Sequence, residues 1–128
     1  MNVHWLTRQA LEAIHDEQLI EHGGLSGIKD ENALEASLAR PLNKAAYETP
    51  DIHDLAAAYL FGIVRNHPFS DGNKRTGFLA AYTFLFINGF QIDATNAEVV
   101  QFVMDVAAGL IGEDNAARWF RDFTVPLG

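Results

Sequence analysis

Apolar residues return every three or four positions along most of the chain, the spacing that places them on one face of a helix. The first three such stretches are residues 6–21, 30–40 and 51–67. Each begins close to a residue that is favoured as a helix N-cap: Thr7, Asp30 and Asp51. The pattern predicts three helices. Pro41 is expected to follow the end of the second helix, and residues 42–50 are expected to be less regular.

The stretch from Asn73 to Asn88 differs, because its apolar residues leave no polar face. A helix that is apolar all round is expected to be buried, so we predict that it is central and that the other helices pack around it. Further helices are expected from about 95–108 and 113–123, with a possible short strand at Phe90–Ile92. The predicted fold class is all-α, with about six helices.

Composition limits the kinds of protein that this chain can be. Its 128 residues are 48% hydrophobic, which suits a single compact domain over residues 1–128. The net charge of −8 argues against a surface that binds nucleic acid directly. No uncharged apolar run is long enough for a membrane span, and the charged N-terminus is unlike a signal peptide. The chain has no cysteine, which is consistent with the cytoplasmic location that we expect.

The break between the third and fourth helices reads "NHPFSDGNKRTGF", residues 66–78. It places Lys74 and Arg75 in the first turn of a helix, where each cation is disfavoured by roughly 0.3–1 kcal/mol. Unpaired N–H groups at a helix N-terminus bind anions, and Gly72 would let a ligand approach the backbone. A phosphate ligand would explain the two cations. In the alternative interpretation, Asp71 pairs with Lys74 and Arg75 points into solvent.

Two other side chains of this segment suit the same chemistry. Asp71 could bind Mg²⁺, which takes one or two carboxylates together with phosphate oxygens, or it could simply form a turn. His67 could accept a proton from an attacking hydroxyl, or it could simply close a helix. Phe69 is expected to be a buried anchor for the loop. His15, on an apolar helix face, is expected to be a hydrogen-bonded core residue.

Taken together, "HPFSDGNKR" resembles the signature of the Fic superfamily, H-x-F-x-D/E-G/A-N-x-R. The "GGLSG" and "AAYE" segments and the flanking helices resemble its Doc (death-on-curing) branch. The resemblance implies an all-α Fic fold in which the motif loop joins two central helices. It also implies roles for each motif residue: base His67, anchor Phe69, magnesium ligand Asp71, anion hole Gly72, Asn73 and Lys74, and phosphate-binding Arg75.

Two positions depart from the AMP-transferring branch of the superfamily, which reads G-N-G-R-x-x-R. Lys74 replaces its second glycine and Phe78 replaces its second arginine. In the Doc branch these differences accompany transfer of the γ-phosphoryl group of ATP, so the resemblance implies a Mg²⁺- and ATP-dependent protein kinase. An AMP transferase is the first alternative. The second is a binding module without catalysis, which the intact motif residues disfavour.

The resemblance also implies partners. In the Doc branch the target is a threonine of elongation factor Tu, whose modification blocks translation. Self-restrained Fic proteins carry S/T-x-x-x-E-G/N, whereas here Gly27 stands four residues before Glu31-Asn32. We therefore expect a separate antitoxin chain, a segment of which folds on binding.

Overall fold

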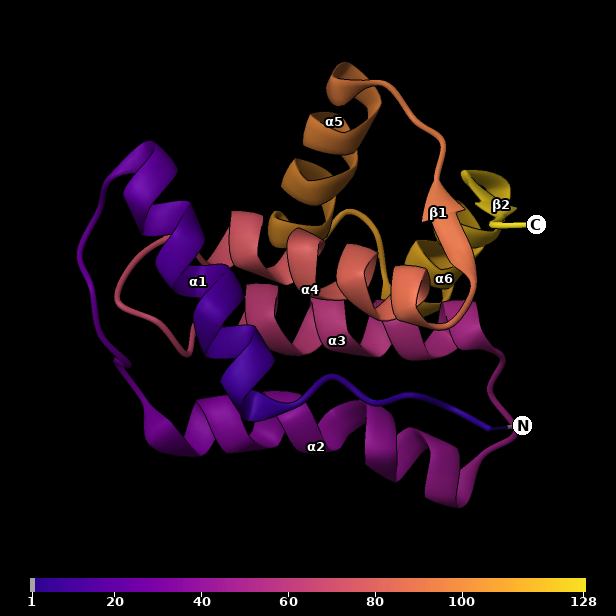
Figure 1. The fold of residues 1–128 in the computed structure, drawn as a ribbon, viewed down its shortest axis with the longest axis horizontal. Coiled ribbons are helices and arrows are strands. Elements are labelled where there is room, and N and C mark those ends of the chain that lie inside the picture. Colours follow the sequence, from indigo (N-terminus) through magenta and orange to yellow (C-terminus); the bar gives the residue numbers. More distant parts are fainter. Residues whose placement is uncertain (1) are drawn as a thin grey trace.

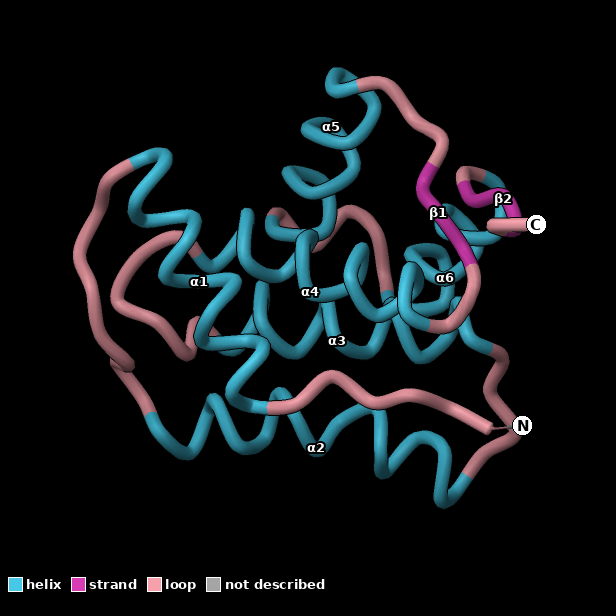
Figure 2. Tube along the Cα trace, in the orientation of Figure 1, coloured by secondary structure: helices cyan, strands magenta, loops and turns pink. Residues whose placement is uncertain are grey.

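The computed structural model describes residues 2–128, which form six helices and one small antiparallel sheet (Figures 1 and 2). The helices are α1 (Arg8–His22), α2 (Glu31–Tyr47), α3 (Ile52–Asn66), α4 (Asn73–Ile87), α5 (Asn96–Ala107) and α6 (Glu113–Asp122). The strands are β1 (Phe90–Ile92) and β2 (Thr124–Pro126), and Gln91 pairs with Val125 at their centre. The predicted all-α class is confirmed, and β1 coincides with the predicted short strand.

Side-chain caps explain where four of the helices begin. The side chains of Thr7, Asp30, Asp51 and Thr95 each accept a hydrogen bond from a backbone N–H in the first turn that follows. Such bonds satisfy N–H groups that have no partner inside the helix. The N-caps predicted at Thr7, Asp30 and Asp51 are therefore confirmed.

The predicted end of the second helix is wrong. Pro41 lies inside α2, which continues to Tyr47. A proline removes one helical hydrogen bond, but packing against the rest of the protein outweighs this loss. Leu34, Ser37 and Pro41 are all buried, and the two turns beyond the proline are tied to α6 through Lys44. Sequence spacing alone does not reveal those contacts.

The helix at the centre of the fold is α3, not α4 as we predicted. Ten of the 15 residues of α3 are buried, and α3 lies between α2 and α4 (Figure 1). Glycines allow this close packing: a Cβ atom on Gly62 would lie 3.1 Å from Ser37 of α2. In α4, by contrast, Tyr82, Phe86 and Ile87 are 38–49% exposed. An all-apolar sequence does not distinguish a core helix from one that also presents an apolar surface.

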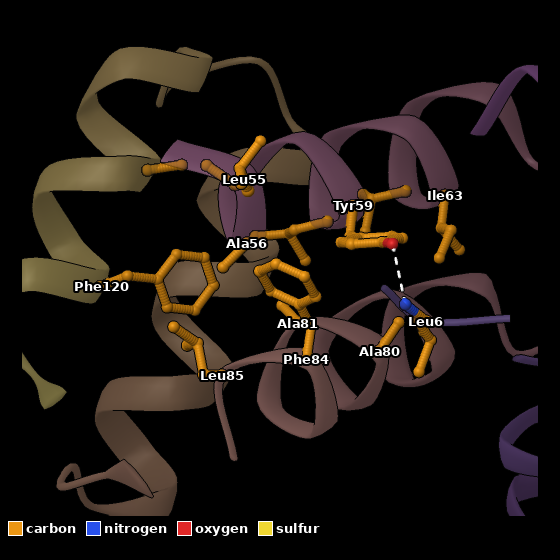
Figure 3. Close-up of a cluster of buried hydrophobic side chains, with 14 of the residues drawn as sticks. Leu6, Leu55, Ala56, Tyr59, Ile63, Ala80, Ala81, Phe84, Leu85 and Phe120 are labelled. Carbon is orange, nitrogen blue, oxygen red and sulfur yellow. Dashed lines mark hydrogen bonds between the residues drawn. The ribbon is translucent and has the colours of Figure 1, made fainter. Parts of the chain in front are cut away.

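One core cluster joins α3, α4 and α6 with the N-terminal segment (Figure 3). The Tyr59 hydroxyl accepts a hydrogen bond of 3.0 Å from the backbone N–H of Leu6, which ties residues before α1 to α3. Burial raises the pKa of Tyr59 to about 12. Phe120 brings α6 into the same cluster. Within residues 2–128, no helix combines the length and the apolar character that spanning a membrane requires.

Candidate functional site

The residues of the motif lie in and just after the loop that joins α3 to α4, residues 67–72, called the motif loop below. The glycine-rich segment 23–30, called the glycine loop, runs beside it (Figure 2). The N–H groups of Lys29 and Asp30 donate to the carbonyl of Pro68 at 2.9 and 3.1 Å, and the N–H of Ser70 donates to the carbonyl of Gly27 at 3.1 Å. The two loops therefore hold each other in place.

Phe69 anchors the motif loop in the protein interior. Its side chain is 1% exposed, and its ring stacks on the ring of His15 with centroids 3.8 Å apart. Asn73 fixes the backbone of the same residue: its side-chain oxygen accepts from the Phe69 N–H at 3.0 Å, and its amide donates to the Phe69 carbonyl at 2.9 Å. The Asn73 side chain is thus largely engaged in shaping the loop.

His67 is the C-cap of α3 and is exposed to solvent. Its backbone is left-handed, with φ 50° and ψ 57°, and it is the one residue other than glycine in 2–128 with a positive φ. Histidine is enriched in this region, and strained backbone is common at functional sites. The predicted helix end before Pro68 is confirmed, and His67 is the first residue of the motif loop.

Asp71 is exposed, and its carboxylate accepts two backbone hydrogen bonds. Oδ1 accepts from the N–H of Gly72 at 3.0 Å and Oδ2 accepts from the N–H of Leu25 at 3.3 Å. A carboxylate has about four acceptor sites, so lone pairs remain for a metal ion. No group of three or more metal-binding side chains occurs within residues 2–128. This set of donors fits Mg²⁺ held by one carboxylate and by phosphate oxygens rather than a metal held by protein alone.

The N-terminus of α4 has neither a side-chain cap nor an acidic residue in its first turn, whereas each of the other five helices of residues 2–128 has at least one of these features. Its N-cap, Gly72, has φ 75° and provides no side-chain hydrogen bond. Among the six helices of residues 2–128, α6 also lacks a side-chain cap, but its first turn carries Glu113 and Asp114. The first turn of α4 instead carries Lys74 and Arg75. An uncapped, positively charged helix end is a site for an anion.

Lys74 and Arg75 are both exposed, and neither forms a salt bridge with any residue from 2 to 128. The alternative in which Asp71 pairs with Lys74 is therefore wrong. The reason is geometric, since the Asp71 carboxylate faces Gly72 N–H and the glycine loop.

A groove of about 790 Å³ connects these residues. Its lining combines polar side chains, among them His67, Asp71, Lys74 and Arg75, with a set of apolar side chains: Phe78, Leu79, Val99, Val100, Val103 and Met104. The volume is typical of sites for small molecules. A second hollow of about 440 Å³, lined in part by Trp5 and Pro50, contains none of the motif residues.

The motif residues lie together around one groove, as expected, but the contacts that support them were not predicted. His15 is buried and hydrogen-bonded, as expected, but its partner is the carbonyl of Asp71, at 2.8 Å. The contact of the glycine loop with the Asp71 carboxylate and the contribution of α5 to the groove were also missed. These contacts join segments that are far apart in the sequence, and the glycine-rich composition of residues 23–27 was the one available signal.

Comparison with known proteins agrees with this geometry. The sequence model of the Fic/DOC family matches residues 5–85, which include α1 to α3 and nearly all of α4. The chain is 33% identical over 117 residues to "Protein kinase doc" of Escherichia phage P1, which covers 91% of this chain and 92% of that protein. It is 42% identical over 98 residues to "Toxin Doc" of Mycolicibacterium smegmatis (strain ATCC 700084 / mc(2)155), covering 73% of this chain and 69% of that protein. The chain therefore belongs to the Fic/DOC family, in its Doc branch.

Proposed function

We propose that this protein is a Doc-type toxin that transfers the γ-phosphoryl group of ATP to a threonine or serine hydroxyl of a target protein. The observation that carries the proposal is the uncapped N-terminus of α4, where Lys74 and Arg75 have no carboxylate partner among residues 2–128. His67, the candidate base, lines the same groove. The names of the two relatives, a protein kinase and a toxin, support the same function.

In the proposed reaction the target hydroxyl oxygen attacks the γ-phosphorus. The bond from that phosphorus to the oxygen bridging the β- and γ-phosphates breaks, and ADP leaves. His67 accepts the hydroxyl proton, and Lys74 and Arg75 stabilise charge on the oxygens of the transferred group. Asp71 would hold Mg²⁺, which neutralises phosphate charge when it is bound.

Lys74 is the residue that favours phosphoryl transfer over AMP transfer. Lys74 places a long, positively charged side chain in the first turn of α4, at the position where the AMP-transferring motif has a glycine. Phe78 lines the groove and packs edge-on against Trp119, with centroids 6.5 Å apart, so no arginine is available there for distant phosphates. Both differences support the kinase interpretation.

Elongation factor Tu is the target that the family resemblance implies, and its modification would block translation. The direct test is to incubate purified elongation factor Tu with the protein, ATP and Mg²⁺, and then to measure the intact mass of the target. A gain of one phosphate is expected. A gain of one AMP would establish the alternative activity, and an unchanged mass would reject this target.

The role of His67 requires a variant that keeps the left-handed backbone. Asparagine tolerates that conformation but cannot serve as a base, so His67→Asn is more informative than alanine. We expect transfer to fall by roughly 10²–10⁴-fold, the typical contribution of a general base. His4→Asn, at an exposed position, serves as the control. If His67→Asn retains the wild-type rate, His67 is not the base.

We further propose that a separate antitoxin restrains this protein through a segment that folds into the groove. Part of the apolar lining remains accessible, with Val100 61% and Met104 51% exposed, while Lys74 and Arg75 would attract acidic residues. Val100→Asp should preserve toxicity but abolish protection by a co-expressed antitoxin. Val125→Asp, on β2, should affect neither property. Full protection of the Val100→Asp variant would place the antitoxin elsewhere.

A further inference from the structure

We propose that His15 is a positioning residue that fixes the peptide bond between Asp71 and Gly72 and thereby directs the Asp71 carboxylate. This inference rests on the proposed role of Asp71 in Mg²⁺ binding. His15 lies in α1, 56 positions before Asp71 in the sequence, and it is 3% exposed. It contacts the motif loop in two ways.

The first contact is a hydrogen bond from the ring. His15 Nε2 lies 2.8 Å from the carbonyl oxygen of Asp71. A carbonyl can only accept, so Nε2 carries the proton. The second contact is the stack on Phe69, with the ring planes 9° apart. A Cβ atom on Gly72 would lie 3.9 Å from the same ring, so His15 covers the loop from Phe69 to the start of α4.

The two ends of the Asp71–Gly72 peptide group are held by different partners. His15 holds the carbonyl, while the N–H of Gly72 donates to Oδ1 of Asp71 at 3.0 Å. Because a peptide group is planar, fixing the carbonyl also fixes the direction of the N–H. That N–H in turn orients the carboxylate. Loss of the bond from His15 would therefore allow the peptide group, and the carboxylate with it, to rotate.

Histidine combines two functions that phenylalanine and glutamine each supply only singly. Phenylalanine would stack on Phe69 but could not donate to the carbonyl, whereas glutamine could donate but could not stack. His15 also lies on the buried face of α1 with Leu11 and Gln18, so the position of the ring is set by the packing of the whole helix. Outer contacts of this kind typically contribute 10–100-fold to metal affinity.

The decisive variant is His15→Phe, which keeps the stack and removes the donor. Calorimetry with ATP, with and without Mg²⁺, measures the gain in affinity that the metal provides. We expect that gain to fall by roughly 10–100-fold, with ATP affinity in the absence of Mg²⁺ unchanged. Hydrogen exchange at the Gly72 amide should become faster. His15→Gln, which keeps a donor, should retain most of the metal effect.

His53→Phe is the matched control, because this substitution also removes a hydrogen bond of a histidine ring. That bond joins His53 Nε2 to the Thr124 hydroxyl at 2.9 Å, at the end of α3 that is farther from the motif loop. An unchanged metal effect and unchanged Gly72 exchange in His15→Phe would overturn the inference. If His15→Phe does not fold, loss of the metal effect in folded His15→Gln would overturn it. If the wild-type protein shows no metal effect, the proposed function fails, and the Gly72 exchange rate alone decides the role of His15.

Discussion

Replacing Gly24 with alanine should weaken Mg²⁺ binding at the proposed Asp71 site without directly altering any motif residue. Gly24 has φ 120°, and a Cβ atom there would lie 2.8 Å from Oδ2 of Asp71. Ordinary contact begins near 3.4 Å, so the carboxylate must move by about 0.6 Å. Mg²⁺ demands near-ideal octahedral geometry with oxygens at about 2.0–2.1 Å, and a displacement of this size is large on that scale.

The effect on stability should be moderate, because the clash is with the end of a side chain. Alanine at a positive φ costs on the order of 1–3 kcal/mol, and the Asp71 carboxylate can turn away at little further expense. Turning away breaks its 3.3 Å hydrogen bond from the Leu25 N–H. The structural consequence is a folded protein with a misdirected carboxylate.

Gly23→Ala is the control for backbone strain. Gly23 also has a positive φ, 74°, but a Cβ atom there would contact nothing within 4 Å. Urea unfolding should show a similar loss of stability for the two variants. Calorimetry with ATP should show a fall of about tenfold in the Mg²⁺-dependent gain in affinity, close to 1.4 kcal/mol, for Gly24→Ala alone. Equal metal effects in the two variants would contradict this prediction, since only the Cβ atom of Gly24→Ala reaches Asp71.

Three further predictions concern chemistry and stability. Lys74→Gly should lower phosphoryl transfer by roughly 10²-fold or more, because a fixed cation is lost from the transferred group, and steady-state rates with radiolabelled ATP measure this. Tyr59→Phe leaves the buried Leu6 N–H without a partner and should lower the free energy of unfolding by about 1–3 kcal/mol in urea titrations. Burial alone would raise the pKa of Glu113, but hydrogen bonds from Lys44 and Arg40 lower this pKa below 4.5. The ionised Glu113 side chain therefore stabilises the folded protein fully above pH 4.5, and this contribution is lost as the pH falls through the lowered pKa. In Glu113→Gln the free energy of unfolding should therefore decrease less steeply as the pH falls below 4.5.

The sequence predicted the elements well because their signals are local. Caps such as Thr7 and Asp51 act within one turn of their own helix, and Pro68 restricts its immediate neighbour. The motif residues follow one another within nine positions, so a single loop necessarily brings them together. That is why the polar groups of the motif that line the groove could be named from the order of residues alone.

The missed features depend on contacts between distant segments. Pro41 stays helical because α2 packs on α3, and α3 is central because it packs on α2, α4 and α6 together. His15 gave the signal of an ordinary core residue, because its partner is a backbone carbonyl that any sequence would provide. Local pattern contains no information about such pairings.

The pairing of β1 with β2 has a consequence for how this protein could diversify. It brings the two ends of residues 90–126 side by side, and this segment supplies the α5 wall of the groove. The family model matches residues 5–85, which include the whole motif, whereas the alignment with the phage P1 relative covers 91% of the chain and extends into this segment. One wall of the groove carries the motif residues, and the other comes from a segment whose two ends pair with each other. Under the proposed function, exchange of that segment between relatives would change which partner is recognised while leaving the reaction intact.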